Sequence, residues 1–231
     1  MRRFYKDVSV AEESGAFRIL LDGKPVKTPS RKVLAAPTRA LAEAIAEEWR
    51  GQAESVQLAD MIFTRLATAG TESVPANRGH IAEQILGFGK SDLLCYRAEA
   101  PRELAAHQAA AWDPLLDWAH RKYGARLAVS TGILFVEQPA EALLALEKAV
   151  WDRDDFALAA LHAVTSITGS LVLALALAER RLTAGEAFAA SRLDETFQAE
   201  KWGQDAEAEA RAARLAGELA AAGRFLRSLD A

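Results

Sequence analysis

The chain has 231 residues, of which 51% are hydrophobic and 26% are charged, a balance typical of one large or two smaller globular domains. Its formal net charge of -4 argues against a general nucleic-acid binder, which normally carries a basic surface. A single cysteine, Cys95, excludes an internal disulfide and suits a reducing cytoplasm. Residues 1–7 include two arginines, but no apolar stretch follows them, so we expect neither a secretory signal nor a transit peptide. We therefore expect a cytoplasmic protein.

The first part of the chain predicts a small antiparallel sheet. Residues 4–10 and 16–21 are rich in strand-forming residues, and a polar turn sequence ending in glycine separates them. Asp22-Gly23 predicts a second tight turn. Residues 24–29 then return as a short extended segment whose prolines suit a sheet edge.

From Pro37 onward the pattern becomes helical. Leu41, Ile45 and Trp49 repeat every four residues beside small alanines, which indicates one buried face. Pro37 fits the first turn of this helix, and Gly51 fits its end.

Two further helical stretches are expected at residues 58–69 and 75–88, the second closed by Gly87 and Gly89. Residues 91–97 are short, apolar and flanked by helix-breaking residues. They suit a buried connector between two domains.

Beyond Pro101 the chain is rich in alanine and leucine and predicts a helical bundle. Asp113 fits the cap of a helix that starts at Pro114 and stops at Gly124, and one longer, kinked helix from Pro101 fits the same residues. Residues 127–136 contain β-branched and aromatic residues that suit an extended segment. Further helices are predicted at residues 139–151, 155–179, 184–202 and 205–226.

One apolar segment raises the question of a membrane span. Residues 156–178 contain no Asp, Glu, Lys or Arg, but the polar residues of the first half favour a buried central helix over a membrane helix. Taken together, the expected strands and helices predict the α+β fold class. A small N-terminal antiparallel β-sheet with helices, over residues 1–90, is joined to a C-terminal orthogonal helical bundle over residues 91–231.

No pattern in the sequence predicts a metal, a cofactor or a nucleophile. Gly87 to Ser91 end in the Gly-Lys-Ser of a phosphate-binding loop, but Gln84 stands where that loop needs its first glycine, and the preceding residues are helical. No Gly-x-Ser-x-Gly turn marks a nucleophile. The histidines do not stand three or four residues from one another or from the cysteine: His80, His107, His120 and His162.

Residues 193–205 place carboxylates and a large aromatic residue on one late helix. At helical pitch Glu195 and Trp202 lie two turns apart on nearly the same face, and Gly203 interrupts the helix. A solvated helix face with the tryptophan packed inward is one interpretation. An acid/base hydrolase using Glu195 and Glu200 is another, but no second catalytic group supports it, and the pattern favours a binding module over an enzyme.

Several ordered motifs, spread over nearly the whole chain, carry a family resemblance. They are Arg3-Phe4-Tyr5, residues 21–29, Glu48-Trp49, residues 92–97, residues 112–119, residues 169–175, Leu193-Asp194-Glu195 and Lys201-Trp202-Gly203. With these motifs the chain resembles the chaperones that assemble the catalytic head of F-type ATP synthase by binding its free α subunit. The absence of a presequence points to a bacterial member.

The resemblance implies a chaperone that is not an enzyme and needs no cofactor. It implies that the chain masks a subunit interface of the free α subunit until β subunits replace it. The family's important acidic position matches Glu195 best, with Glu200 a weaker match. We expect Glu195, helped by Glu200 and Asp205, to accept hydrogen bonds from the α subunit, while Trp202 supports the helix from behind.

The same reasoning predicts a monomer that binds no nucleic acid and does not insert stably into a membrane. The other tryptophans considered are expected to pack in the core rather than to contact a partner: Trp49, Trp112 and Trp118.

Overall fold

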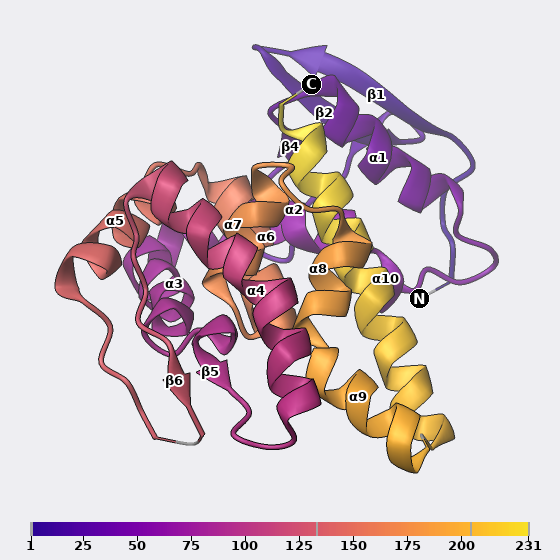
Figure 1. The fold of residues 1–231 in the computed structure, drawn as a ribbon. Helices are drawn as coiled ribbons and strands as arrows, with labels where there is room; N and C mark the ends of the chain where they lie inside the picture. The colour runs from indigo at the N-terminus through magenta and orange to yellow at the C-terminus, as the bar shows by residue number, and fades with distance from the viewer. Residues whose placement is uncertain (1, 133, 204, 231) are drawn as a thin grey trace. The chain divides into compact units, whose positions relative to one another are not determined.

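The computed structural model of the chain describes residues 2–132, 134–203 and 205–230 (Figure 1). These residues form two compact units. Unit 1 combines the described residues up to Gly79 with Asp154–Ala160 and the described residues from Ala221 onward, and unit 2 combines His80–Arg153 with Leu161–Ala220. Each unit is therefore assembled from segments that are distant in the sequence. The division between residues 90 and 91 stays a prediction.

Unit 1 contains the expected antiparallel sheet, in which β2 lies between its neighbours. The strands are β1 (Val8–Glu13), β2 (Ala16–Leu21), β3 (Lys24–Pro25) and β4 (Ala35–Ala36). β2 pairs with β1 in the register Val8↔Leu21 to Glu13↔Ala16, and also pairs with β3 and β4. At Asp22 and Gly23 the φ angles are 48° and 76°, as a tight hairpin turn with both central residues in the left-handed region requires.

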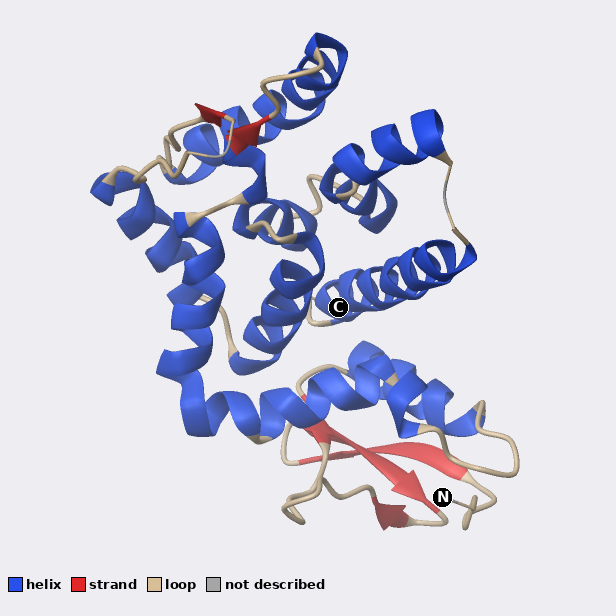
Figure 2. Cartoon of the chain, turned by 90° about the horizontal axis from the view of Figure 1, so that it is seen from below, coloured by secondary structure: helices blue, strands red, loops and turns tan. Residues whose placement is uncertain are grey.

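Helix α1 (Arg39–Arg50) packs on this sheet, and Figure 2 shows helices on one face of the strands. It buries Leu41, Ile45 and Trp49, so the predicted buried face is confirmed. Thr38 caps the helix because its side chain accepts a hydrogen bond from the Leu41 N–H. The predicted place of Pro37 in the first turn is wrong, because Pro37 precedes this capping residue.

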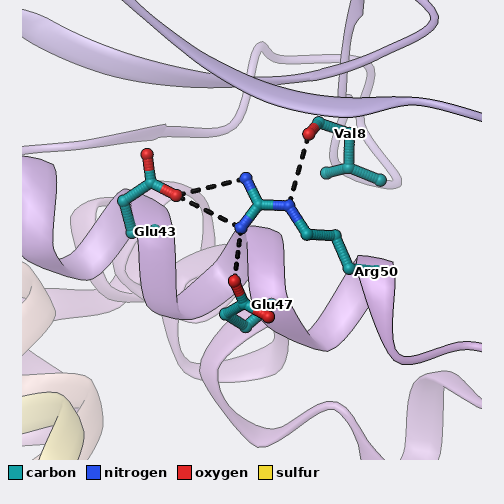
Figure 3. Close-up of polar contacts among 4 residues, drawn as sticks. All are labelled: Val8, Glu43, Glu47 and Arg50. Atoms are coloured by element: carbon teal, nitrogen blue, oxygen red, sulfur yellow. Dashed lines mark hydrogen bonds and ion pairs between the residues drawn. The ribbon is translucent and has the colours of Figure 1, made fainter.

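Arg50, at the end of α1, ties the helix to the edge of the sheet (Figure 3). Its Nε donates to the backbone oxygen of Val8 in β1 at 3.3 Å. Its two Nη atoms lie 3.3 and 3.2 Å from Glu43 Oε2, and Nη1 also lies 2.5 Å from Glu47 Oε1. Glu47 and Glu43 lie about one and two turns before Arg50 on the same helix, so they fix the guanidinium in the orientation that reaches β1.

A carboxylate of α1 holds the start of the next helix. The short helix η1 (Leu58–Asp60) is followed by α2 (Ile62–Thr71). Glu48 accepts hydrogen bonds from the N–H groups of Phe63 and Thr64 at 2.7 and 2.8 Å and from the Thr64 hydroxyl at 2.9 Å. Glu48 thus satisfies N–H groups that the first turn of α2 leaves without a helical partner.

Helix α3 (Ser73–Lys90) continues through both glycines that were expected to end it. Gly89 is helical, and a Cβ at that position would lie 3.1 Å from Leu171 Cδ2. The glycine therefore serves close packing rather than helix termination, and that part of the prediction is wrong.

The remaining elements are mostly helices, which confirms the predicted α+β class. They are η2 (Leu93–Cys95), β5 (Tyr96–Arg97), α4 (Arg102–Tyr123), β6 (Ser130–Thr131), α5 (Ala140–Trp151), α6 (Asp155–Thr168), α7 (Leu171–Ala178), α8 (Ala184–Ser191), α9 (Leu193–Trp202) and α10 (Ala206–Ser228). β5 and β6 form a parallel pair.

Some helix boundaries differ from the prediction. α4 is one helix with Pro114 inside it, so the longer of the two alternatives is correct and Asp113 is not a cap. The helix expected over residues 155–179 breaks at Gly169, whose φ is +68°, and Ser170 caps α7 by accepting a hydrogen bond from Leu173 N–H. The helix expected over residues 184–202 breaks at Arg192.

The segment expected to be extended, residues 127–136, contains only β6 as a strand among its described residues, and residue 133 lies outside them.

Helix α7 lies at the centre of unit 2. All of its side chains from Leu171 to Leu177 are buried, as expected for a central helix. Trp112 is also buried, and its Nε1 donates to the backbone oxygen of Ala190 at 2.9 Å, whereas Trp118 is half-buried. Over the described residues, no helix is both long enough and apolar enough to cross a membrane.

Candidate partner-binding surface

The inner face of α9 is fixed against α4 by Phe197. This side chain is buried and meets the ring of His107 edge-on at a centroid distance of 6.0 Å. Lys201 Nζ lies 4.1 Å from the centre of the Phe197 ring and 3.0 Å from Glu103 Oε2 in the first turn of α4. α9 is therefore a positioned helix with a defined outer face.

Trp202 belongs to that outer face. Its side chain is 77% exposed, so the expectation that it supports the helix from behind is wrong. Helical pitch explains the difference, because five residues separate Trp202 from Phe197 and rotate it by about 140° away from the buried side. Glu195, seven residues before Trp202, points within about 20° of the same direction.

The carboxylates of this region do not converge on one point. Glu195 is exposed and its Oε1 lies 2.8 Å from Arg192 Nη1, an ion pair within one helical turn. Glu200 is exposed and lies about 140° around the helix from Glu195. Asp205 is exposed and accepts a hydrogen bond from the Ala208 N–H at 2.8 Å, so it caps the start of α10.

This arrangement is unsuited to the hydrolase alternative. An acid and a base must reach the same bond within a cleft. Glu195 and Glu200 project from different sides of α9 into solvent. The exposed ion pair of Glu195 contributes about 1 kcal/mol or less, so this carboxylate can exchange Arg192 for a partner's cation at little cost.

The structure adds Asp194 to the site, a residue that the sequence prediction did not select. Gln108 of α4 is buried, its Oε1 accepts a hydrogen bond from the Ala98 N–H at 2.7 Å, and its Nε2 donates to Asp194 Oδ1 at 2.7 Å. Asp194 is half-buried and lines a hollow of about 560 Å³ together with residues 96–100 and Gly132. The carboxylate is thus held in place, in contrast to the freely exposed Glu195.

The sequence contained a signal for the hydrogen bond between Gln108 and Asp194. Leu104, Gln108 and Trp112 recur every four residues on the buried face of α4, so a glutamine stands in an apolar row. A buried amide requires hydrogen-bond partners, but the row could not show that one of them is Asp194, 86 residues away.

Other reactive groups are part of the scaffold. Burial raises the pKa of the Cys95 thiol to about 12, so the thiolate form is suppressed. Gly87, Gly89 and Lys90 lie within α3, and not in a loop that could cradle phosphates. Among the described residues, no group of three or more His, Cys, Asp or Glu side chains could hold a metal ion.

Known proteins resemble this chain in both sequence and fold. Residues 2–120 match the family described as ATP12 chaperone protein. Atp12 from Paracoccus denitrificans is 42% identical, with a TM-score of 0.93 over 99% of this chain and 98% of that one. A variant of the Paracoccus protein with one aspartate replaced by lysine also has a TM-score of 0.93 to this chain.

Other organisms also contain relatives of this chain. A protein of known structure from Agrobacterium tumefaciens is 46% identical, with a TM-score of 0.95 over 99% of this chain and 86% of that one. The mitochondrial protein atp12 of Schizosaccharomyces pombe is 26% identical over 214 residues, which cover 87% of this chain and 74% of that protein. The chain therefore belongs to the ATP12 chaperone family, whose members are assembly factors of ATP synthase and not enzymes.

Proposed function

We propose that this chain binds the free α subunit of F-type ATP synthase through the outer face of α9. The observation that carries the proposal is the position of Trp202, which is 77% exposed and in line with Glu195, while Phe197 fixes the opposite side of the helix. A large aromatic held in solvent beside a carboxylate is typical of a contact surface, because tryptophan contributes strongly to protein interfaces.

The chemistry of a free subunit fits such a face. A subunit taken from an oligomer exposes apolar surface that its neighbours later cover, and this surface promotes aggregation. Trp202 offers apolar area to it, and Glu195, with Glu200 and Asp205 nearby in the sequence, offers acceptors for basic or amide groups. One chain binds one α subunit, and β subunits displace it by competition for the same surface.

Reversing the charge of Glu195 tests this proposal. Glu195→Lys replaces an acceptor by a cation, and we expect capture of purified α subunit to weaken by about tenfold or more, the equivalent of about 1.4 kcal/mol. The matched control is Glu147→Lys, which reverses an exposed glutamate on α5. Both variants should melt at the temperature of the unchanged protein, since surface substitutions usually alter stability by less than about 0.5 kcal/mol.

Equal capture by the Glu195→Lys and Glu147→Lys variants would rule out Glu195 as a contact. Loss of capture in both variants would show that net charge, rather than the outer face of α9, determines binding.

A further inference from the structure

The loop between α4 and α5 presents large apolar side chains to solvent. Leu134 is 76% exposed and Phe135 is 70% exposed, and Val129 on the other side of β6 is 47% exposed. Neighbouring exposed side chains of this size form an apolar tip, defined here as Leu134 and Phe135. Apolar patches that a folded protein leaves uncovered mark interaction sites.

Hydrogen bonds fix the base of this loop. β6 is paired with β5, and the Gly132 N–H donates to the Arg97 backbone oxygen at 2.8 Å. Gln138 is buried and closes the loop from the other side, because its side-chain amide bonds both the N–H and the oxygen of Ala128, at 2.8 and 3.0 Å. The apolar tip is therefore carried on an ordered base.

The loop that carries the apolar tip borders the same hollow as α9. Asp194 lines it from α9, Gly132 lines it from the loop, and residues 96–100 form the part between them. Figure 1 shows β5 and β6 next to each other near the start of α4, the helix on which α9 packs. The start of α9 and the loop that carries the apolar tip therefore share one hollow of unit 2.

The hollow carries an excess of negative charge. Its lining contains two carboxylates, Glu99 and Asp194, and one cation, Arg97, whose Nη2 pairs with Asp113 Oδ1 at 2.6 Å. Asp194 and the exposed Glu99 have no ion pair within the described part of the chain. A cationic side chain that entered the hollow would meet two carboxylates. One is Asp194, which Gln108 holds in place, and the other is Glu99 on the rim.

We propose that the apolar tip is a second contact region for the α subunit, and that the hollow takes a lysine or arginine of that subunit flanked by apolar residues. This inference rests on the proposed function, because it concerns the same partner. The acidic hollow and the adjoining apolar tip together select a basic side chain within an apolar surface.

Site-specific photo-crosslinking tests the contact directly. Phe135→p-benzoylphenylalanine should form a covalent adduct with purified α subunit on irradiation. The matched control is Phe4→p-benzoylphenylalanine, since Phe4 is 63% exposed and belongs to unit 1. Adducts at Phe135 and not at Phe4 are expected, and equal adducts at both positions would overturn the inference.

Capture by the unchanged protein, measured in parallel, separates the two proposals. Capture of the α subunit without an adduct at Phe135 overturns this inference and leaves the proposed function standing. If the unchanged protein captures no α subunit, both fall together.

A second pair of variants tests the tip and the hollow separately. The double variant Leu134→Ser and Phe135→Ser should bind the α subunit about tenfold more weakly with an unchanged melting temperature. Asp194→Asn keeps the acceptor for Gln108 but removes the charge, so binding should weaken and depend less on salt concentration. Unchanged affinity and salt dependence in Asp194→Asn would show that no cation enters the hollow.

Discussion

Asp92 shows how a single motif residue supports the scaffold rather than the surface. Its carboxylate is fully buried, with Oδ1 accepting from the Leu94 N–H at 3.1 Å and Oδ2 from the Val172 N–H at 3.0 Å. One side chain therefore caps both η2 and the start of α7. Burial raises the pKa of Asp92 to about 6, although the hydrogen bonds it accepts act in the opposite direction.

This raised pKa predicts a pH dependence of stability with a definite sign. Between about pH 4 and pH 6 the folded protein keeps the Asp92 proton while the unfolded chain has lost it. Raising the pH across this window therefore lowers the free energy of unfolding, by about 3 kcal/mol at most. Asp92→Asn removes this contribution, so the stability of the natural protein relative to this variant should fall from pH 4 to pH 7 in denaturant titrations. A difference that stays constant or grows with pH would contradict the assignment.

Other residues of the recognised motifs have similar structural roles. Trp112 packs in the core of unit 2. In unit 1 the Tyr5 hydroxyl donates to the Trp49 backbone oxygen at 2.6 Å, and Glu48 caps α2. Most residues of the family motifs therefore stabilise the fold. The exposed carboxylates of α9 are the motif residues that remain available to contact a partner.

At the scale of elements, α9 has one face that stabilises the fold and another face that is free to bind a partner. Phe197 on the inner face is 5% exposed, whereas Trp202 on the outer face is 77% exposed. The two aromatics should therefore respond in opposite ways to truncation.

Phe197→Ala should lower the free energy of unfolding by about 3 to 5 kcal/mol, because it leaves a cavity against α4. Trp202→Ala should change stability by less than about 0.5 kcal/mol but weaken binding of the α subunit by about 2 kcal/mol. Thermal melts and titrations of both variants test this division. A clear loss of stability in Trp202→Ala would mean that the residue supports the helix after all.

The helices that the sequence predicted well have one apolar face. In α1, Leu41, Ile45 and Trp49 define that face, and Gly51 marks its end. The boundary between α6 and α7 was missed because the residues of α7 are buried on all sides. The apolar pattern of the sequence therefore does not change where the helix breaks at Gly169. The local sequence also favoured a helix start at Pro114, but α4 continues through it.

The candidate site was predictable only in part. Glu195 was correctly expected to lie at the surface, but the inner aromatic of α9 could not be chosen from spacing alone, because Phe197 and Trp202 are both suited to burial. Contacts with His107 and Glu103 of α4 settle the orientation of α9. These contacts link residues that are far apart in the sequence.

At the scale of the whole molecule, the fold brings separate segments to one surface. The hollow combines α9, the β5 region and the loop that contains Gly132, and no motif in the sequence joins them. Both compact units are also built from separate stretches of chain. The surface proposed for binding is a product of this assembly and not of one linear motif.

The proposed surface should distinguish the free α subunit from the assembled one. If the chain masks an interface of the free α subunit, it should bind isolated α subunit and should not bind the assembled catalytic head, where β subunits cover the same surface. Calorimetric titration of the chain into purified α subunit, then into α subunit mixed with excess β subunit, measures this directly. We predict one chain bound per free α subunit and loss of binding as β subunit is added. Equal binding to the assembled head, or no binding to the free α subunit, would contradict the account.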